Sequence, residues 1–216
     1  MKCIVTAGPT FEPLDEVRRL TNSSTGRVGS ELANHLAACG HQVTLLLGSS
    51  ATFHTPLTVQ HLERFTNTAD LRARLAAMAD PSVGAVLHAA AISDFAFGRV
   101  FRRRADGVLV ECRDRKIPTA NESLLAELTA TPKLLDELRG WYPQARLVGW
   151  KYEVQGDTAS VVAQARAQIA RSRTDACVAN GPAYGAGFGF VVGTDACRHL
   201  PDSPALHAAL AEWIRG

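Results

Sequence analysis

Short apolar segments alternate with amphipathic ones along most of this chain, and this alternation constrains the fold more than any other feature. The apolar segments are bounded by turn residues, as buried parallel strands are. They cover residues 2–7, 42–47, 84–90, 145–149 and 175–179. The amphipathic segments carry apolar residues at helical spacing and cover residues 24–39, 68–79, 132–139, 158–173 and 204–215. This order predicts right-handed βαβ units in a Rossmann-like, doubly wound, mainly parallel α/β sheet with helices on both faces.

Two segments interrupt the alternation. Residues 95–116 are too long for a loop between a strand and a helix, and they contain strand-like runs on both sides of Asp106-Gly107. That pattern predicts a protruding β-hairpin. Residues 99–116 hold seven basic side chains against three acidic ones, which fits either a solvated face or a flap that meets an anion. Residues 181–193 contain five glycines and lead into a strand at Val191 and Val192.

Composition excludes several classes of protein. With 216 residues, 46% of them hydrophobic and 20% charged, the chain predicts a single globular domain over 1–216 rather than a disordered protein. Its net charge of +2 gives no reason to expect nucleic acid or membrane binding. No apolar run reaches the ~20 residues of a membrane span, and no signal peptide opens the chain, so we expect a cytoplasmic protein. The five cysteines lack metal-ligand spacing and predict reduced thiols.

In a doubly wound sheet, ligands bind beyond the carboxyl ends of the strands. The first apolar run is followed by Gly8-Pro9-Thr10 instead of a GxGxxG fingerprint, and the second ends without an acidic residue, which disfavours an ordinary dinucleotide dehydrogenase. The segment from Asn22 to Gly26 (NSSTG) precedes a predicted helix, where free N–H groups and hydroxyls hold phosphate or carboxylate groups. We therefore predict an anion or acyl site here; the alternative is a simple Ser/Thr helix cap.

These residues also carry a family resemblance. Residues 6–29, TAGPTFEPLDEVRRLTNSSTGRVG, resemble the signature of the phosphopantothenoylcysteine synthetase (phosphopantothenate-cysteine ligase) family, approximately TAGGTxEPIDxVRxIxNxSSGxxG, with the same spacing. Later segments resemble that family in the same order: AAAISDF at 89–95, Lys116-Ile117, the TPKLL of 131–135, VGWKYE at 148–153 and DACVAN at 175–180. The flavin-dependent decarboxylase that bacterial relatives often carry in front is absent here, so a separate decarboxylase protein is expected in the pathway.

The resemblance implies a synthetase-like nucleotide-binding domain that acts in coenzyme A biosynthesis. CTP or ATP would activate 4′-phosphopantothenate as an acyl nucleotidylate, with Mg²⁺ bound to the phosphates, and the cysteine amine would then attack. The partners implied are these small molecules and a second copy of the chain, because the family forms homodimers through strands like those expected at 95–115. Two alternatives remain: a divergent member that binds a nucleotide or a pantothenate-like ligand without ligation, and an NAD(P)-binding oxidoreductase.

The resemblance also assigns roles to residues. Asn22 would hold the acyl intermediate as a neutral donor, Arg18 would clamp a carboxylate or phosphate, and Lys116 would neutralise phosphate charge. The ligand-binding positions implied are Gly8, Thr10, Ser23, Ser24, Gly26, Asp94, Pro132, Trp150, Lys151 and Asn180. The alternatives are a surface ion pair of Arg18 with Glu12 or Asp15, a plain helix cap for Asp94, and core packing for Trp150. We interpret His88, inside an apolar run, as a buried histidine and not as a catalyst.

The sequence departs from the family mainly on the nucleotide side. Pro118 stands in the lysine-rich stretch that begins at Lys116, where Arg113 and Arg115 are the nearest replacements. Lys133 stands where the family has aspartate, and Gln168 and Ser172 stand where bacterial members have lysines. These changes leave the choice between CTP and ATP open.

Overall fold

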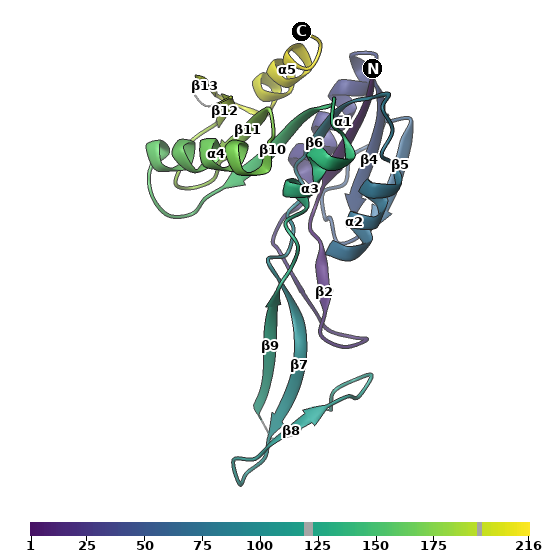
Figure 1. The fold of residues 1–216 in the computed structure, drawn as a ribbon, viewed down its shortest axis with the longest axis vertical. Helices are drawn as coiled ribbons and strands as arrows, with labels where there is room; N and C mark the ends of the chain where they lie inside the picture. Colours follow the sequence, from purple (N-terminus) through teal and green to yellow (C-terminus); the bar gives the residue numbers. More distant parts are fainter. Residues whose placement is uncertain (119–122, 194–195) are drawn as a thin grey trace.

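The central element of the computed structural model is an eight-stranded sheet with the order β13-β12-β11-β10-β6-β1-β4-β5 (Figure 1). The structure describes residues 1–118, 123–193 and 196–216. The strands of the sheet are β1 (Lys2–Ala7), β4 (Gln42–Gly48), β5 (His61–Phe65), β6 (Val83–His88), β10 (Arg146–Tyr152), β11 (Ala176–Asn180), β12 (Phe188–Val192) and β13 (Ala196–Leu200). The pairs from β11 to β5 are parallel, whereas β12 and β13 pair antiparallel at one edge. The predicted doubly wound, mainly parallel fold is therefore confirmed.

Helices cover both faces of this sheet, because its strands are apolar on both sides. The helices are α1 (Arg27–Ala38), α2 (Thr68–Ala77), α3 (Leu134–Trp141), α4 (Thr158–Ser172) and α5 (Ser203–Trp213). Cys3, Val5 and Ala7 of β1 point to the side of α1 and α5, and Ile4 between them points to the side of α2 and α3. This alternation is the two-residue period of a strand, and it produces one core on each face. Among the described residues, no helix has the length and apolar composition to span a bilayer.

Glycines determine how closely α1 packs on the sheet. Gly26 has φ 82°, a left-handed conformation that glycine adopts without strain, and it starts the helix. A Cβ on Gly29 would lie 2.6 Å from the Cβ of Ala7 and 3.1 Å from the backbone oxygen of Thr6. The first turn of α1 therefore lies directly against the end of β1, where the sequence predicts ligands.

Three antiparallel strands form a long projection, which we call the arm (Figure 1). Its strands are β7 (Phe95–Arg103), β8 (Leu109–Cys112) and β9 (Ser123–Ala130), in the order β8-β7-β9. The hairpin expected at 95–116 is present as β7 and β8, with Gly107 at φ 84° in the turn. The partner strand β9 was not predicted, because SLLAELTA is rich in helix-forming residues and pairing with β7 overrides that preference. Residues 119–122, between Pro118 and β9, lie outside the described residues.

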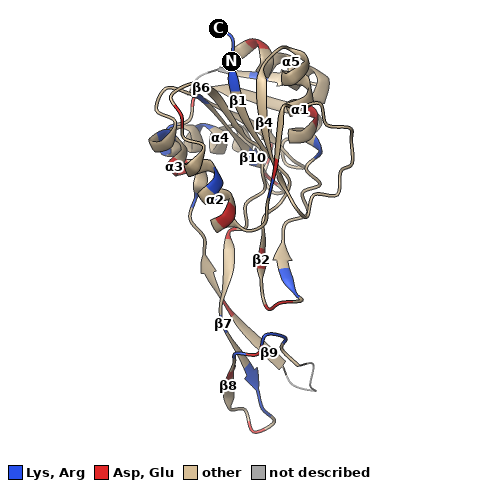
Figure 2. Ribbon diagram, turned by 90° about the vertical axis from the view of Figure 1, so that its right-hand side faces the viewer, with Lys and Arg blue, Asp and Glu red and all other residues tan. Residues whose placement is uncertain are grey.

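Basic and acidic residues are interspersed along the arm (Figure 2), and several of its arginines form ion pairs. Arg99 binds Glu127 at 2.8 Å and Arg113 binds Glu111 at 3.0 Å. Both arginines are exposed, and such surface pairs contribute little to stability. For these two arginines the geometry favours the solvated-face interpretation.

A second, smaller hairpin of β2 (Phe11–Pro13) and β3 (Arg19–Thr21) lies beside the arm. Strands of three residues give too short a pattern to predict. The helix expected from residue 132 begins at Leu134 instead, because Thr131 does not cap it and hydrogen bonds elsewhere.

Candidate active site at the carboxyl edge of the sheet

The strand order reverses between β1 and β6, and the loops that follow these two strands meet there. From β1 the chain runs outward to β4 and β5, then returns to β6 and continues in the other direction. The Ala91 N–H donates to the oxygen of Gly8 at 3.0 Å, and the Thr10 N–H donates to the oxygen of Ala91 at 3.1 Å. Ligands of doubly wound folds bind at such a reversal. The structure therefore brings the predicted Gly8 and Thr10 next to the segment that carries Asp94.

A buried polar network supports these loops. Thr10 is fully buried, and its Oγ1 accepts from the N–H of Ser93 at 2.8 Å. The carboxylate of Glu12 accepts from the N–H of Thr68 at 3.0 Å and from its hydroxyl at 2.7 Å. Because Thr10 is committed to this network, it holds the site's framework. Gly8, at φ 79°, leaves room only for backbone, since a Cβ there would lie 2.9 Å from the Cβ of Ala51.

The NSSTG segment leaves part of the N-terminus of α1 open. The N-cap residue is Gly26, which offers no side chain to the helix, and the first turn contains no acidic residue. The Oγ1 of Thr25 accepts from the N–H of Arg27 at 3.3 Å, so the Ser/Thr-cap alternative holds for one N–H of the first turn. Ser23 is exposed, Ser24 is half-buried, and Asn22 precedes them with its Nδ2 donating to the oxygen of Ile92 at 2.9 Å. Asn22 thus joins the start of α1 to the loop after β6.

Asp94 lies across this edge from Asn22, at the start of β7 and close to α3. It forms an ion pair with Lys133, the N-cap residue of α3, and both side chains are more than half exposed. Thr131 fixes the approach of α3, because its N–H donates to the oxygen of Asp94 at 3.0 Å and its hydroxyl donates to the oxygen of Ser93 at 2.5 Å. Asp94 precedes a strand, so the alternative of a plain helix cap is wrong. The exposed Pro132 lies between Thr131 and Lys133.

The ends of β10, β11 and β12 border a cavity of about 570 Å³. Its lining includes Arg27, Tyr152, Asn180, Phe188 and Asp202, so it opens between the first turns of α1 and α5. The Oδ1 of Asn180 is buried and has no hydrogen-bond partner among the described residues. Buried polar atoms are normally paired, so this oxygen indicates a place for a ligand or a water molecule.

Trp150 and Lys151 precede this cavity on β10. The Trp150 ring packs partly against the core beside α1 and α5, which agrees with its core-packing alternative. Its indole Nε1 is nonetheless buried without a hydrogen-bond partner in the described part of the chain. Lys151 forms an ion pair of 2.7 Å with Glu153. Together with Asn180, the indole gives this edge two buried polar atoms that a bound molecule could satisfy.

Arg18 and Lys116 lie apart from Asn22, where the arm meets the β2–β3 turn. The guanidinium of Arg18 binds the carboxylate of Asp15 at 2.6 Å and the oxygen of Ile117 at 2.5 Å. Burial opposes ionisation of Asp15, but hydrogen bonds from the N–H groups of Val17, Arg18 and Ile117 and from the Arg18 guanidinium hold its pKa below the usual range. The ion-pair alternative with Asp15 is therefore realised. Along the extended β3, four residues place Arg18 roughly 13 Å from Asn22.

His88 lies beneath the site at the end of β6. Its Nδ1 is 2.9 Å from the hydroxyl of Thr6, and burial lowers the pKa of His88 to about 4. The histidine is neutral near pH 7, and its interpretation as a buried structural residue is supported. Within the described ranges, no group of three or more His, Cys, Asp and Glu side chains is arranged to hold a metal ion.

Three residues at this edge were not selected from the sequence as binding residues. In the sequence, Lys133 is only a departure from the family's aspartate, although it lies inside the TPKLL segment and contacts Asp94. Arg27 follows Gly26 directly, and Tyr152 follows Lys151; both line the larger cavity. Each of these residues is adjacent in the sequence to a predicted site position. Adjacency, and not residue type, is therefore the feature of the sequence that could have identified them.

Comparison with known proteins agrees with this geometry. The chain is 32% identical over 216 residues to the "Coenzyme A biosynthesis bifunctional protein CoaBC" of Thermococcus kodakarensis, covering 98% of this chain and 50% of that protein. It thus spans about half the length of the curated relatives it matches. The DNA/pantothenate metabolism flavoprotein from Streptococcus pneumoniae superposes with a TM-score of 0.86 at 24% identity, covering 100% of this chain and 98% of the other. A Cab2 mutant H337A in complex with phosphopantothenate-cysteine superposes with a TM-score of 0.67 at 18% identity, covering 100% and 89%.

These two solved structures establish the fold. The family defined as the DNA/pantothenate metabolism flavoprotein C-terminal domain matches residues 1–201, which include every site residue described above except Asp202. The chain is similar to CoaBC proteins of coenzyme A biosynthesis, and it belongs to the DNA/pantothenate metabolism flavoprotein C-terminal domain family.

Proposed function

We propose that this chain is a ligase of coenzyme A biosynthesis that joins cysteine to 4′-phosphopantothenate through an acyl nucleotidylate. The observation that carries the proposal is the N-terminus of α1, which lies next to Asn22, has glycine as its N-cap residue, and has only its first N–H bonded to the Thr25 hydroxyl. A helix N-terminus in this state attracts phosphate and carboxylate groups. Family membership, and the phosphopantothenate-cysteine held by the Cab2 complex of similar fold, add support.

In this proposal the acid substrate lies between α1 and the larger cavity. Ser23, Ser24 and the backbone at Gly26 meet its carboxylate end, and Asn180 offers its unpartnered oxygen to a hydroxyl or amide N–H of the pantothenate part. The volume of about 570 Å³ falls within the range of small-molecule sites, which is roughly 300–1,000 Å³. The carboxylate of the substrate then points toward Asn22.

The nucleotide, CTP or ATP, lies on the other side of Asn22, near Asp94, Pro132 and Trp150. Lys133 supplies a positive charge on this side of the site. Gln168, which stands where bacterial members have a lysine, supplies none, because it is neutral, buried and donates to the oxygen of Trp150 at 3.3 Å. Mg²⁺ usually binds through one or two carboxylates together with substrate phosphates, and the exposed carboxylate of Asp94 fits such a site. When bound, Mg²⁺ would neutralise charge on the phosphates.

The reaction needs two displacements. The carboxylate oxygen of phosphopantothenate attacks the α-phosphorus and pyrophosphate leaves; the cysteine amine then attacks the acyl carbon, loses a proton, and the nucleoside monophosphate leaves. The Nδ2 of Asn22 donates to the acyl oxygen as negative charge develops on it, in place of its present bond to the oxygen of Ile92. Because an amide donor is neutral, it stabilises this oxygen without adding a net charge to the site.

Arg18 and Lys116 would serve a site across a homodimer. Both lie at the junction of the arm and the β2–β3 turn, away from Asn22 of their own chain. The arm exposes apolar side chains that an isolated ribbon cannot keep in water: Phe95, Val108, Leu109, Val110, Leu124 and Leu128. A two-fold contact through this surface would bury them and place Arg18 near the other subunit.

The test is pyrophosphate release, measured with CTP or ATP, with and without phosphopantothenate and cysteine. We expect amide formation only when both substrates are present. Asn22→Asp should lower kcat by about 10²- to 10³-fold, because it replaces a neutral donor with a negative charge, while the nucleotide KM changes little. Asn67→Asp is a matched control, since its side chain caps α2 through an oxygen that aspartate also supplies.

Three results would contradict the proposal or a part of it. Thermal stabilisation by nucleotide and phosphopantothenate without any turnover would identify a binding protein of the same fold. Near wild-type turnover in Asn22→Asp would remove Asn22 from the mechanism. A change in nicotinamide absorbance with an added substrate would favour the oxidoreductase alternative.

A further inference from the structure

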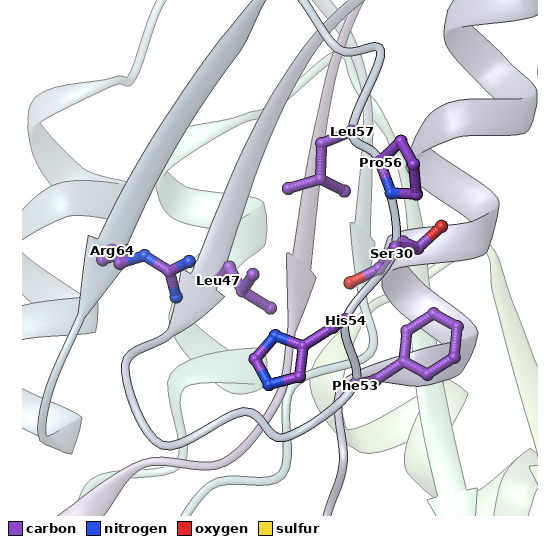
Figure 3. Close-up of a pocket in the computed structure, with 8 residues that line it drawn as sticks. Ser30, Leu47, Phe53, His54, Pro56, Leu57 and Arg64 are labelled. Carbon is purple, nitrogen blue, oxygen red and sulfur yellow. The ribbon is translucent and has the colours of Figure 1, made fainter.

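A second cavity, of about 310 Å³, lies beside β4 and β5, separate from the site described above (Figure 3). It opens between α1, the ends of these two strands, and the segment of residues 49–60 that connects them. Six side chains define its character: Ser30, Leu47, Phe53, His54, Leu57 and Arg64. It shares no lining residue with the larger cavity.

This cavity is held open by α1. The N–H of Phe53 donates to the oxygen of Thr25 at 3.0 Å, which fixes one end of the connecting segment. The amide of Asn34 fixes the other end, donating to the oxygen of Pro56 at 2.8 Å and accepting from the N–H of Thr58 at 2.8 Å. The connecting segment is thus hydrogen-bonded at one end to Thr25, just before α1, and at the other to Asn34 in α1. Because the segment is already held in place, ligand binding would not have to order it.

The polar groups of the cavity are unpaired within the described part of the chain. The Ser30 side chain is buried at 1% exposure, and its Oγ has no hydrogen-bond partner. Arg64 projects from β5 toward the opening, and His54 projects from the connecting segment on the same side (Figure 3). No carboxylate lines the cavity to neutralise the arginine. The buried hydroxyl of Ser30 indicates a place for a polar group of a ligand, and the exposed guanidinium of Arg64, with no carboxylate in the cavity lining, can bind an anionic group at the opening.

The remaining walls are apolar. Leu47 and Leu57 form one part, and the ring of Phe53 forms another, with the guanidinium of Arg27 over that ring at 5.8 Å. An apolar slot next to a cationic opening fits a flat, organic body that carries one phosphate. The volume lies at the lower limit of small-molecule sites, which favours a monophosphate over a triphosphate.

We infer that this second cavity binds a nucleoside 5′-monophosphate. The base packs against Phe53 and Leu57 and hydrogen bonds to Ser30, and the phosphate binds Arg64 and His54. The inference stands on the cavity itself and does not depend on the proposed ligase reaction. Arg27 lines the larger cavity, and its guanidinium lies over the ring of Phe53, which lines the second cavity. Arg27 therefore separates a ligand in the second cavity from the candidate active site.

Hydrogen–deuterium exchange of the full chain tests the inference, with CMP and AMP as probes and with cytidine and inorganic phosphate as their halves. A monophosphate should slow exchange in residues 53–58, and either half alone should bind about tenfold more weakly. Arg64→Gln should weaken the protection of 53–58 at least tenfold, and Ser30→Ala should weaken it less. Arg72→Gln is the matched control, because Arg72 is exposed on α2 and pairs with Glu137.

Three outcomes would overturn the inference. The first is protection by CMP and AMP confined to residues 22–30 and 91–94. The second is unchanged protection of 53–58 in Arg64→Gln. The third is equal binding of inorganic phosphate, which would show an anion site that does not recognise a nucleoside.

Discussion

Glu12 lies in β2, a strand of only three residues, yet its replacement by alanine should destabilise this protein strongly. Glu12 is 6% exposed, and its carboxylate accepts two hydrogen bonds from Thr68, one from the N–H and one from the hydroxyl. Hydrogen bonds to a charged group contribute about 1.5–3 kcal/mol each, so Glu12→Ala should lower the free energy of unfolding by about 3–6 kcal/mol. For a chain of this length, that corresponds to a fall in Tm of roughly 6–24 °C.

Urea denaturation and scanning calorimetry measure this effect, and two variants control it. Glu12→Gln keeps an oxygen acceptor for Thr68 and should lose less than half as much stability. Glu16→Ala removes an exposed glutamate from the same turn, where an ion pair contributes about 0–1 kcal/mol. If Glu12→Ala unfolds within 1 kcal/mol of the wild type, the network around Thr10 does not hold the site's loops together, and our account of Thr10 as a framework residue fails.

Further predictions concern the nucleotide, the arm and pH. Asp94→Asn and Lys133→Ala should each raise the nucleotide KM about tenfold with a smaller change in kcat, measured by pyrophosphate release; unchanged KM values would show that their ion pair only positions α3. Nucleotide at saturation should slow protease nicking within residues 99–116, and an unchanged rate would mean that this basic stretch does not close over ligand near Lys116. Phe101→Asp should lower both oligomer mass and activity, and a wild-type monomer near 23 kDa in sedimentation equilibrium would refute the dimer. The pKa of His88 is about 4 in the folded state, below its unfolded value of about 6.5, so its contribution to stability is complete above pH 6.5 and is lost as the pH falls toward 4. The urea concentration at the unfolding midpoint should therefore decrease as the pH is lowered from 6.5 to 4. If His88→Gln shows the same decrease, groups other than His88 cause it.

Most of the central sheet could be predicted because five of its parallel strands are buried on both faces. Residues 2–7 and 84–90 are mostly apolar, and a pattern of this kind does not depend on which strand lies beside it. The parallel edge strand β5 is largely exposed and lacks this pattern. The exposed β9 could not be predicted in the same way. Its side chains favour a helix, and only pairing with β7 makes it a strand. The short β2 and β3 contain too few residues to show a period.

The site was predictable to the extent that topology determines it. Asn22 and Asp94 follow elements whose ends must meet at one edge of the sheet, and they do lie at that edge. The ion pair of Asp94 with Lys133 depends on where α3 begins, and Thr131 determines that through bonds to Ser93 and Asp94 that no local pattern encodes. The burial of Thr10 likewise depends on Thr68 and Ser93, which are distant from it in the sequence.

The arm also determines how the molecule moves through solution. A thin ribbon that extends far from the sheet adds much friction and little mass (Figure 1). A single chain of 23.1 kDa with this outline should diffuse slowly and elute early from a sizing column, as a heavier sphere would. Two copies that bury their arms against each other would be more compact for their mass. Elution volume therefore separates the two states poorly, whereas the intensity of scattered light, which follows mass and not outline, separates them well.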